Sequence, residues 1–413
     1  MKRYVSVIII IIVIAVVAIG GIFLFKKNPS LLNGSFVGSL PQVGVQGGGG
    51  SNTGQNGSGQ AINNQSTTTS IAGATSSFGI VATGPISDYF VTPGNEIEAV
   101  KSNGEVILVS NGTTTVVSTS TLNNIIYAKF SSDGSKVLVS FGDPNNPNLS
   151  IFDMASKTWA DGPKGAQSPS WAPSGYKIAY LSSLGGGSLS LLTIDGANLK
   201  NPPSKIITLH VGGVVMNWVA NGIFSLSDKS SSQTVGSLWL FNAQTDTMVP
   251  AAYEAPGIES IWGGVNNLGL VFQDNSTGKG GLSLVNDNGS LYHPLNFLTM
   301  PSKCGFGEAT SSVAVASGTT TSTTAQNQTT TPYLYCGVPI DQASFANATL
   351  PDDYTMMSLF TSDEIMRVDT VNGAKDVLWN NPSFQIDATD MKKFNNDLFF
   401  VNRYDQDLYM LGL

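Results

Sequence analysis

The feature of this sequence that most constrains its fold is a pattern that recurs every 40 to 50 residues from about Phe78 onwards. In each copy, an apolar segment ends in an aromatic residue, a turn rich in Gly, Asn or Asp follows, and further short apolar segments complete the unit. The clearest copy contains Ile125–Phe130, the turn Ser131–Gly134 and Val137–Val139. Short apolar segments separated by such turns predict antiparallel β-strands.

The aromatic residues that end the first segment of each copy, the marker aromatics, define the length of the repeat. Their spacings are 40, 41, 47, 44, 44 and 88 residues. A period of this length with four strands per unit is typical of β-propeller blades. The sequence therefore predicts an all-β propeller over residues 79–413. The marker aromatics are Phe90, Phe130, Trp171, Trp218, Trp262, Phe306 and Phe394.

The last spacing indicates a blade with two insertions, near residues 317–332 and 340–358. With these set aside, the pattern predicts seven four-stranded blades, although six or eight also fit it. The last blade lacks a fourth strand before the chain ends. We expect Phe78–Ala82 to supply that strand, because such a closure leaves no open sheet edge in the last blade.

Two blades carry a local motif at the corner after the marker aromatic. Phe130-Ser131-Ser132-Asp133-Gly134 and Trp171-Ala172-Pro173-Ser174-Gly175 resemble the corner of TolB-type, WD-repeat-like propellers. The motif is partial at Phe90–Gly94 and mostly lost after Trp218. The resemblance implies protein–protein binding outside the cytoplasm, and it carries over no catalytic residue.

The N-terminal segment Val5–Phe25 is apolar at every position except Ser6. As a helix it would span about 30 Å, the thickness of the hydrocarbon core of a membrane. We therefore interpret residues 1–27 as a single-pass signal anchor with a cytoplasmic N-terminus, which would place the propeller in the periplasm or at the cell surface. The alternative is a cleaved signal peptide, whose apolar region is normally shorter.

Residues 28–78 contain no charged residue and are rich in Gly, Ser, Thr and Asn, which predicts a flexible linker. Beyond Lys27 the chain has 16 basic and 28 acidic residues, a balance of −12. A nucleic-acid-binding domain normally shows a basic face, so nucleic acid is not an expected partner.

Cys304 and Cys336 are the two cysteines, and each lies on a predicted strand of the sixth blade. Outside the cytoplasm, an even pair predicts a structural disulfide, with buried free thiols or a metal or redox role as alternatives. A closed loop of this length would contribute about 3.7 kcal/mol of stability.

No residue pattern predicts a catalytic site, a metal site or a cofactor. The histidines, His210 and His293, lie at expected strand edges and form no short metal motif. Asp287-Asn288-Gly289 fits a tight turn as well as part of a calcium loop. Asp352-Asp353 and the acidic pair around Gln406 are expected in exposed turns.

Aromatic residues could form a binding surface, since Tyr and Trp are frequent in binding hot spots. The candidates are Tyr89, Trp171, Trp218, Trp239 and Trp262. Their place in the repeat instead favours packing between blades for the marker aromatics.

The leading hypothesis is a membrane-anchored, non-catalytic propeller that binds or scaffolds a protein of the cell envelope. The alternative is an envelope enzyme or small-ligand receptor with its site at the central funnel. We expect the 340–358 insertion to be the recognition element, and to be removable without unfolding the domain.

Overall fold

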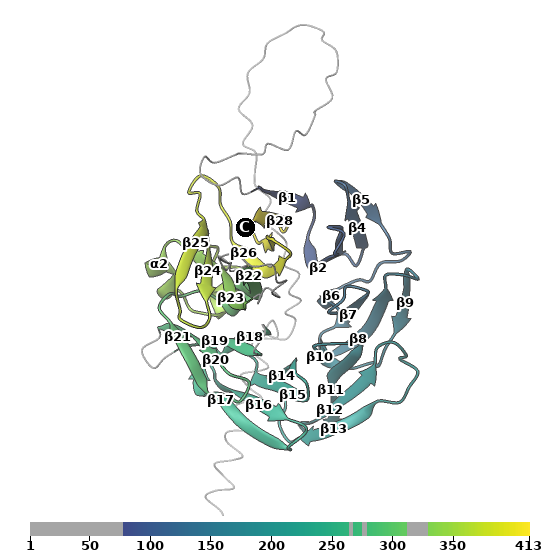
Figure 1. Cartoon of the computed structure of the whole chain (residues 1–413). Helices are drawn as coiled ribbons and strands as arrows, with labels where there is room; N and C mark the ends of the chain where they lie inside the picture. The colour runs from purple at the N-terminus through teal and green to yellow at the C-terminus, as the bar shows by residue number, and fades with distance from the viewer. Residues whose placement is uncertain (1–76, 264–266, 275–278, 312–328) are drawn as a thin grey trace, which may run out of the picture. The chain divides into compact units, whose positions relative to one another are not determined.

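The computed structural model describes residues 77–263, 267–274, 279–311 and 329–413. These residues form seven four-stranded antiparallel sheets arranged in a ring (Figure 1). The prediction of seven blades is confirmed. The proposed anchor and nearly all of the proposed linker lie outside the described residues. From Ser77 onwards, no described helix is long and apolar enough to cross a membrane.

Blades 1 to 4 follow one another along the chain, each with its first strand innermost. Blade 1 contains β2 (Ile86–Val91), β3 (Ile97–Lys101), β4 (Val106–Ser110) and β5 (Thr113–Val116). Blade 2 contains β6 (Ile125–Phe130), β7 (Lys136–Asp143), β8 (Asn146–Asp153) and β9 (Thr158–Asp161). Blade 3 contains β10 (Gln167–Trp171), β11 (Lys177–Gly185), β12 (Ser188–Asp195) and β13 (Ser204–Leu209). Blade 4 contains β14 (Val214–Ala220), β15 (Ile223–Asp228), β16 (Val235–Asn242) and β17 (Thr247–Pro256).

Blades 5 to 7 complete the ring. Blade 5 contains β18 (Glu259–Gly263), β19 (Leu268–Asp274), β20 (Gly280–Val285) and β21 (Leu291–Leu295). Blade 6 contains β22 (Cys304–Ser311), β23 (Thr329–Pro339), β24 (Asp363–Asp369) and β25 (Lys375–Trp379), and the short helix η2 (Pro301–Lys303) precedes it. Blade 7 contains β26 (Ala388–Phe394), β27 (Asp397–Asn402), β28 (Leu408–Gly412) and β1 (Phe78–Ala82).

The strand β1 closes the ring as the sequence predicts. It pairs antiparallel with β28, with Phe78 opposite Leu411 and Ala82 opposite Leu408. One blade is therefore built from both ends of the described chain. Because β1 covers the outer edge of β28, blade 7 has the same four-stranded form as the others.

The burial of each strand follows its place in the blade. The second strand of blade 2 carries Val137, Leu138 and Val139, which are all fully buried because neighbouring blades cover both faces of the sheet. The outermost strand of blade 1, β5, is exposed along its whole length and consists mainly of threonine. Continuous apolar segments inside and polar segments at the rim are the expected result of stacking sheets face to face.

The corner motif of blade 2 has a direct structural reason. Gly134 has a φ of 77°, and its amide donates to the carbonyl of Ser131 to close the turn. A Cβ atom at Gly134 would lie 2.2 Å from the ring of Phe90 in blade 1. A side chain there would therefore strain the backbone and push the two blades apart.

The second insertion folds against blade 6 instead of projecting from it. It contains α2 (Gln342–Ala346) and α3 (Asp352–Thr355), between β23 and β24. Phe345, Leu350 and Tyr354 are buried in the hydrophobic core that blades 5 and 6 share. The burial of these side chains argues against the expectation that this segment can be removed without unfolding the domain, since its removal would open that core.

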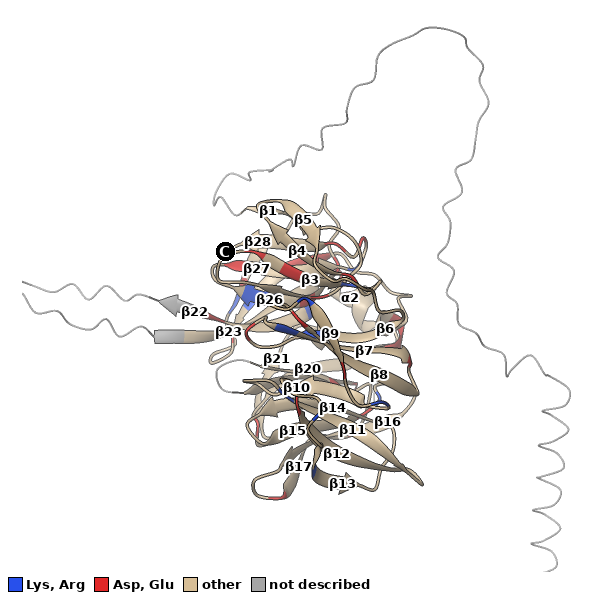
Figure 2. Ribbon diagram, turned by 90° about the vertical axis from the view of Figure 1, so that its right-hand side faces the viewer, with Lys and Arg blue, Asp and Glu red and all other residues tan. Residues whose placement is uncertain are grey.

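The first insertion lies mostly outside the described residues. Its expected end at residue 332 is wrong, because β23 begins at Thr329 and pairs with β22 from there. In Figure 2, β22 and β23 project from one face of the ring, at the end of the blade where the first strand turns into the second.

Candidate binding site at the propeller axis

A cavity of about 620 Å³ lies at the axis of the ring, and the first strand of every blade contributes to its wall. All seven marker aromatics border it, one from each blade. Six of them lie at or near the end of the strand at which the chain turns into the second strand of the blade, whereas β22 continues beyond Phe306 to Ser311. The repeat that defines the blades therefore also builds an aromatic ring at one mouth of the axial cavity.

The marker aromatics also pack between blades, as predicted. The ring of Phe90 lies 6.3 Å from that of Phe130 and 5.3 Å, edge to face, from that of Phe394. Phe130 and Trp171 are buried, whereas the other five are only partly covered. The same residues thus pack between blades and line the cavity, two roles that the sequence offers as alternatives.

The three tryptophans of the ring satisfy their indole N–H groups within the protein. Trp171 donates to the carbonyl of Lys129 at 2.9 Å, Trp218 donates to that of Ala220 at 2.9 Å, and Trp262 donates to the hydroxyl of Ser260 at 3.2 Å. The tryptophans therefore contribute carbon surface to the cavity rather than free donors, which suits an apolar or aromatic ligand group.

Of the aromatic residues considered for a binding surface, Trp239 lies elsewhere. It is on β16, the third strand of blade 4, and packs edge to face with Tyr253. Tyr89 borders the cavity, but its side chain is buried and its hydroxyl donates to the carbonyls of Asp390 and Phe399 in blade 7. Burial, with the carboxylates of Asp390 and Asp88, raises the pKa of Tyr89 well above its usual value.

Four charged residues form one wall of the cavity, where blades 7, 1 and 2 meet. Lys129 lies 3.3 Å from a carboxylate oxygen of Asp88 and 3.3 Å from one of Asp390. Lys392 pairs with the same two carboxylates. Burial alone would lower the pKa of Lys129, but Asp390 and Asp88 raise it well above its usual value. These two cations and two anions balance and join blade 7 to blades 1 and 2. Lys393 also borders the cavity, and burial lowers its pKa.

Asp88 also binds a backbone N–H group. The inner edge of the first strand of a blade pairs with no other strand, so its backbone N–H groups need other acceptors. The other carboxylate oxygen of Asp88 accepts from the amide of Phe130 at 2.6 Å. In the same way, the hydroxyl of Ser170 accepts from the amide of Trp218 at 3.0 Å. Side chains of one blade thus satisfy the inner edge of the next.

The opposite wall of the cavity, from blades 3 to 5, carries polar groups without charge, namely Ser170, Asn217 and Ser260. Within the described part of the chain, the side-chain amide of Asn217 makes no hydrogen bond. It is half-buried and faces a cavity, so it can offer both a donor and an acceptor to a ligand.

A second charged network is fully buried between blades 6 and 7. The ammonium group of Lys303, which is 0% exposed, lies 2.7 Å from Asp363 and also pairs with Asp387. Arg403 contacts the other oxygen of Asp387 at 2.8 Å, and the ring of Tyr354 from the insertion lies 3.7 Å from the Arg403 guanidinium. Burial raises the pKa of Asp363 despite the nearby Lys303. This network anchors the insertion to the ring.

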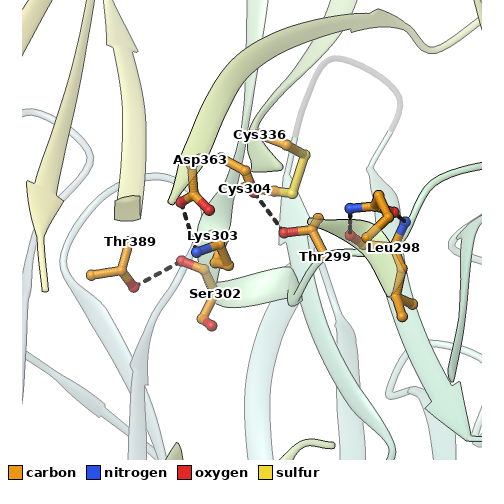
Figure 3. Close-up of a disulfide and its surroundings, with 10 residues drawn as sticks. Leu298, Thr299, Ser302, Lys303, Cys304, Cys336, Asp363 and Thr389 are labelled. Carbon is orange, nitrogen blue, oxygen red and sulfur yellow. Dashed lines mark hydrogen bonds and ion pairs between the residues drawn. A yellow bond between two sulfur atoms is a disulfide. The ribbon is translucent and has the colours of Figure 1, made fainter. Parts of the chain in front are cut away.

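The predicted disulfide is present and lies beside this network (Figure 3). Cys304 and Cys336 are directly opposite each other on β22 and β23, and both are buried. The bond therefore fixes the pairing of the first two strands of blade 6. Next to it, the hydroxyl of Thr299 donates to the carbonyl of Gly337 at 2.6 Å.

The other candidate residues lie away from the axis. His210 is exposed after β13, and His293 is on β21, the outermost strand of blade 5. The sequence Asp287-Asn288-Gly289 forms the tight turn between β20 and β21, in which the Gly289 amide donates to the Asn286 carbonyl. Asp352 accepts hydrogen bonds from Ser231 and Ser232 and thereby ties the insertion to blade 4.

No protein-family model matches this sequence, and no curated protein matches it. Among solved structures, TolB from Acinetobacter baumannii is 16% identical over 52% of this chain and 55% of its own, with a TM-score of 0.37. An oligogalacturonate lyase in complex with manganese is 10% identical over 83% of this chain and 94% of its own, with a TM-score of 0.49. The β-propeller domain of the Trilobed protease from Pyrococcus furiosus is 11% identical over 67% of this chain and 76% of its own, with a TM-score of 0.39.

These likenesses concern the fold alone, and the chain spans only about half the length of the TolB chain. The class of the protein follows from its own structure: it is a seven-bladed β-propeller of four-stranded sheets.

Proposed function

We propose that this protein is a non-catalytic binding propeller that takes an apolar or aromatic side chain of a partner protein into its axial cavity. The observation that carries the proposal is the ring of marker aromatics around the mouth of that cavity. Aromatic side chains dominate binding hot spots because they bury a large area with few rotatable bonds. The ring is also rigid, since the same residues hold the blades together.

Four of the five charged residues that border the cavity form a network that supports binding rather than catalysis. Lys129 and Lys392 are neutralised by Asp88 and Asp390, and Tyr89 is held by backbone carbonyls. A general acid or base needs a proton that a substrate can reach and a pKa near the working pH. These groups instead stabilise one another and the closure of the ring.

For the setting, we propose that Val5–Phe25 anchors the chain in a membrane and that residues 28–78 hold the propeller outside the cytoplasm. The disulfide of blade 6 supports an oxidising compartment, since such bonds persist mainly in exported proteins. The partner would then be another protein of the envelope or cell surface.

Site-specific photo-crosslinking of the full-length protein in its native membrane tests the proposal. A photoreactive phenylalanine analogue replaces Trp262, in the ring, or Trp239, an equally half-buried tryptophan away from it. We expect a protein adduct from position 262 and none from position 239. Equal adducts from both positions, or none from position 262, would contradict the proposal.

The second candidate is a small-ligand receptor that uses the same cavity. Its volume of about 620 Å³ favours this function, because typical small-molecule sites measure roughly 300–1,000 Å³. The same experiment separates the two. A partner protein adds its whole mass to the adduct at position 262, whereas a small ligand adds only its own.

A further inference from the structure

A second surface of the propeller lies at the end of blades 6 and 7 that faces away from the aromatic ring. Large apolar side chains are exposed there. The surface is formed by the segment that follows α3, between the second and third strands of blade 6, and by the turn between β27 and β28. Connections of this kind lie at the end of a blade opposite the turn between its first and second strands. We call this surface the methionine patch: Met356, Met357, Phe360 and Tyr404.

The side chains of the patch are unusually exposed for their type. Met356 is 69% exposed, Met357 45%, Phe360 39% and Tyr404 43%. The rings of Phe360 and Tyr404 stack with their centroids 5.3 Å apart. Exposed apolar side chains gathered in one place are typical of interaction sites, whereas single ones need no explanation.

Arg403 holds the segment from Tyr354 to Phe360 in a fixed turn. Its guanidinium donates to the carbonyl of Tyr354 at 2.7 Å and to that of Leu359 at 3.2 Å, and lies 4.9 Å from the ring of Phe360. Arg403 is in turn fixed by Asp387 in the buried network. The patch is therefore preorganised, which reduces the entropy that a partner must overcome on binding.

Near the patch, the positive charges are buried and the negative charges lie closer to the surface. The cations Lys303 and Arg403 are buried and neutralised by Asp363 and Asp387. Carboxylates lie nearer the surface. Asp353 borders the turn and is half-buried, and its carboxylate accepts from the amide of Thr349 at 2.8 Å. Asp405 follows Tyr404 and is exposed, and its carboxylate accepts from the hydroxyl of Tyr409 at 2.7 Å. The surface is thus apolar at its centre and acidic at its border.

We propose that the methionine patch binds a basic amphipathic segment of a partner protein. The apolar side chains of that segment would pack on Met356, Met357 and Phe360, and its Lys or Arg side chains would pair with Asp353 and Asp405. Methionine suits this role because its flexible, polarisable side chain adapts to different apolar partners. This site is separate from the axial cavity, and it stands or falls independently of the function proposed there.

Fluorescence anisotropy with two synthetic peptides tests the proposal on the full-length protein. Each peptide is an amphipathic helix of about 18 residues with leucine on one face, and the other face carries lysine in one peptide and glutamate in the other. We expect the lysine peptide to bind and the glutamate peptide not to bind. The double variant Met356→Asp, Met357→Asp should bind the lysine peptide at least about tenfold more weakly.

The direction of the change in affinity for the lysine peptide is informative, because the double variant adds two negative charges. If the lysine peptide were attracted only by the acidity of the chain, the variant would bind it more tightly. Met248→Asp is the matched control, since Met248 on β17 is 42% exposed and lies in blade 4. We expect it to bind like the wild type or slightly more tightly. Asp405→Asn should weaken binding, and less so at high salt.

Unchanged or tighter binding by the double variant would overturn the proposal, as would equal binding of the glutamate peptide. Two further measurements test whether the patch binds something other than a basic segment of a partner protein. Self-association lost in the double variant, seen by sedimentation, would indicate a second copy of this chain. Binding to zwitterionic lipid vesicles lost in that variant would indicate a membrane surface. Thermal melting of each variant is the control for folding. We expect every variant to fold, because all the replaced side chains are exposed.

Discussion

Replacing Lys303 with methionine tests whether the buried network holds blades 6 and 7 together. Methionine is an unbranched side chain one atom shorter than lysine, and it removes the charge. Among the described residues, Lys303 is the only cation within ion-pair distance of Asp363, whereas Asp387 keeps its contact with Arg403. Removing one member of a buried ion pair typically costs about 3–5 kcal/mol, because the remaining charge stays buried without compensation.

The loss of stability in the Lys303→Met variant should depend on pH in a defined direction. Burial already raises the pKa of Asp363 in the folded protein, and loss of Lys303 raises it further. A carboxyl group whose pKa is higher in the folded state favours folding at low pH, and that contribution is lost as the pH rises through the folded pKa. The Lys303→Met variant should therefore be closer to the wild type at about pH 5 than at about pH 8.

Urea unfolding at these two pH values measures both effects. Lys205→Met is the control, because Lys205 is exposed on the rim strand β13, and we expect it to change stability by less than about 0.5 kcal/mol. A loss below about 1 kcal/mol for Lys303→Met, or a loss that is the same at both pH values, would refute this account of the network.

Two further predictions concern blade 1. Tyr89→Phe should lower the free energy of unfolding by about 1–3 kcal/mol, because it leaves the carbonyl of Asp390 without its donor in the closure of the ring; an unchanged urea midpoint would contradict this. Burial and neighbouring carboxylates raise the pKa of Glu98 to about 7, so its contribution to stability is present at low pH and lost as the pH rises through that value. Glu98→Gln should therefore gain stability relative to the wild type between about pH 5 and pH 8 in urea titrations, and an equal difference at both pH values would argue against it.

The blades could be predicted because their signals are local and repeated. Each blade has one marker aromatic on its first strand, so the spacings favour seven blades even where two insertions double one spacing, although six or eight blades also fit the sequence. The pairing of Cys304 with Cys336 follows from the same repeat, because it places them on adjacent strands. The closing strand Phe78–Ala82 follows from the missing strand at the other end of the chain.

The two charged networks could not be predicted, because their members are distant in sequence. Asp88 and Lys392 are 304 residues apart and meet only when the ring closes. Neither residue belongs to a local motif. Lys303 follows the same rule, since its partners lie on other strands and loops that the chain reaches much later. Such contacts are a consequence of the tertiary fold rather than of any local pattern.

The nature of the 340–358 insertion was also hidden in the sequence. Its polar and acidic residues predict an exposed loop, yet Phe345, Leu350 and Tyr354 are buried. Phe345 and Tyr354 fall on two very short helices and Leu350 lies in the turn between them, and such short elements show too few turns for a helical period to be recognised. For the marker aromatics, the sequence indicated packing but not that the packed residues would also border a cavity.

Hydroxyl-radical footprinting tests the central claim, that the aromatic ring at the axis is the binding site, most directly. The oxidation of Trp218, Trp262 and Trp239 is compared between the full-length protein in intact cells and the same protein after purification. The account predicts that Trp218 and Trp262 are protected in the cells and that Trp239 is equally oxidised in both. Equal oxidation of all three tryptophans in the two samples would contradict it.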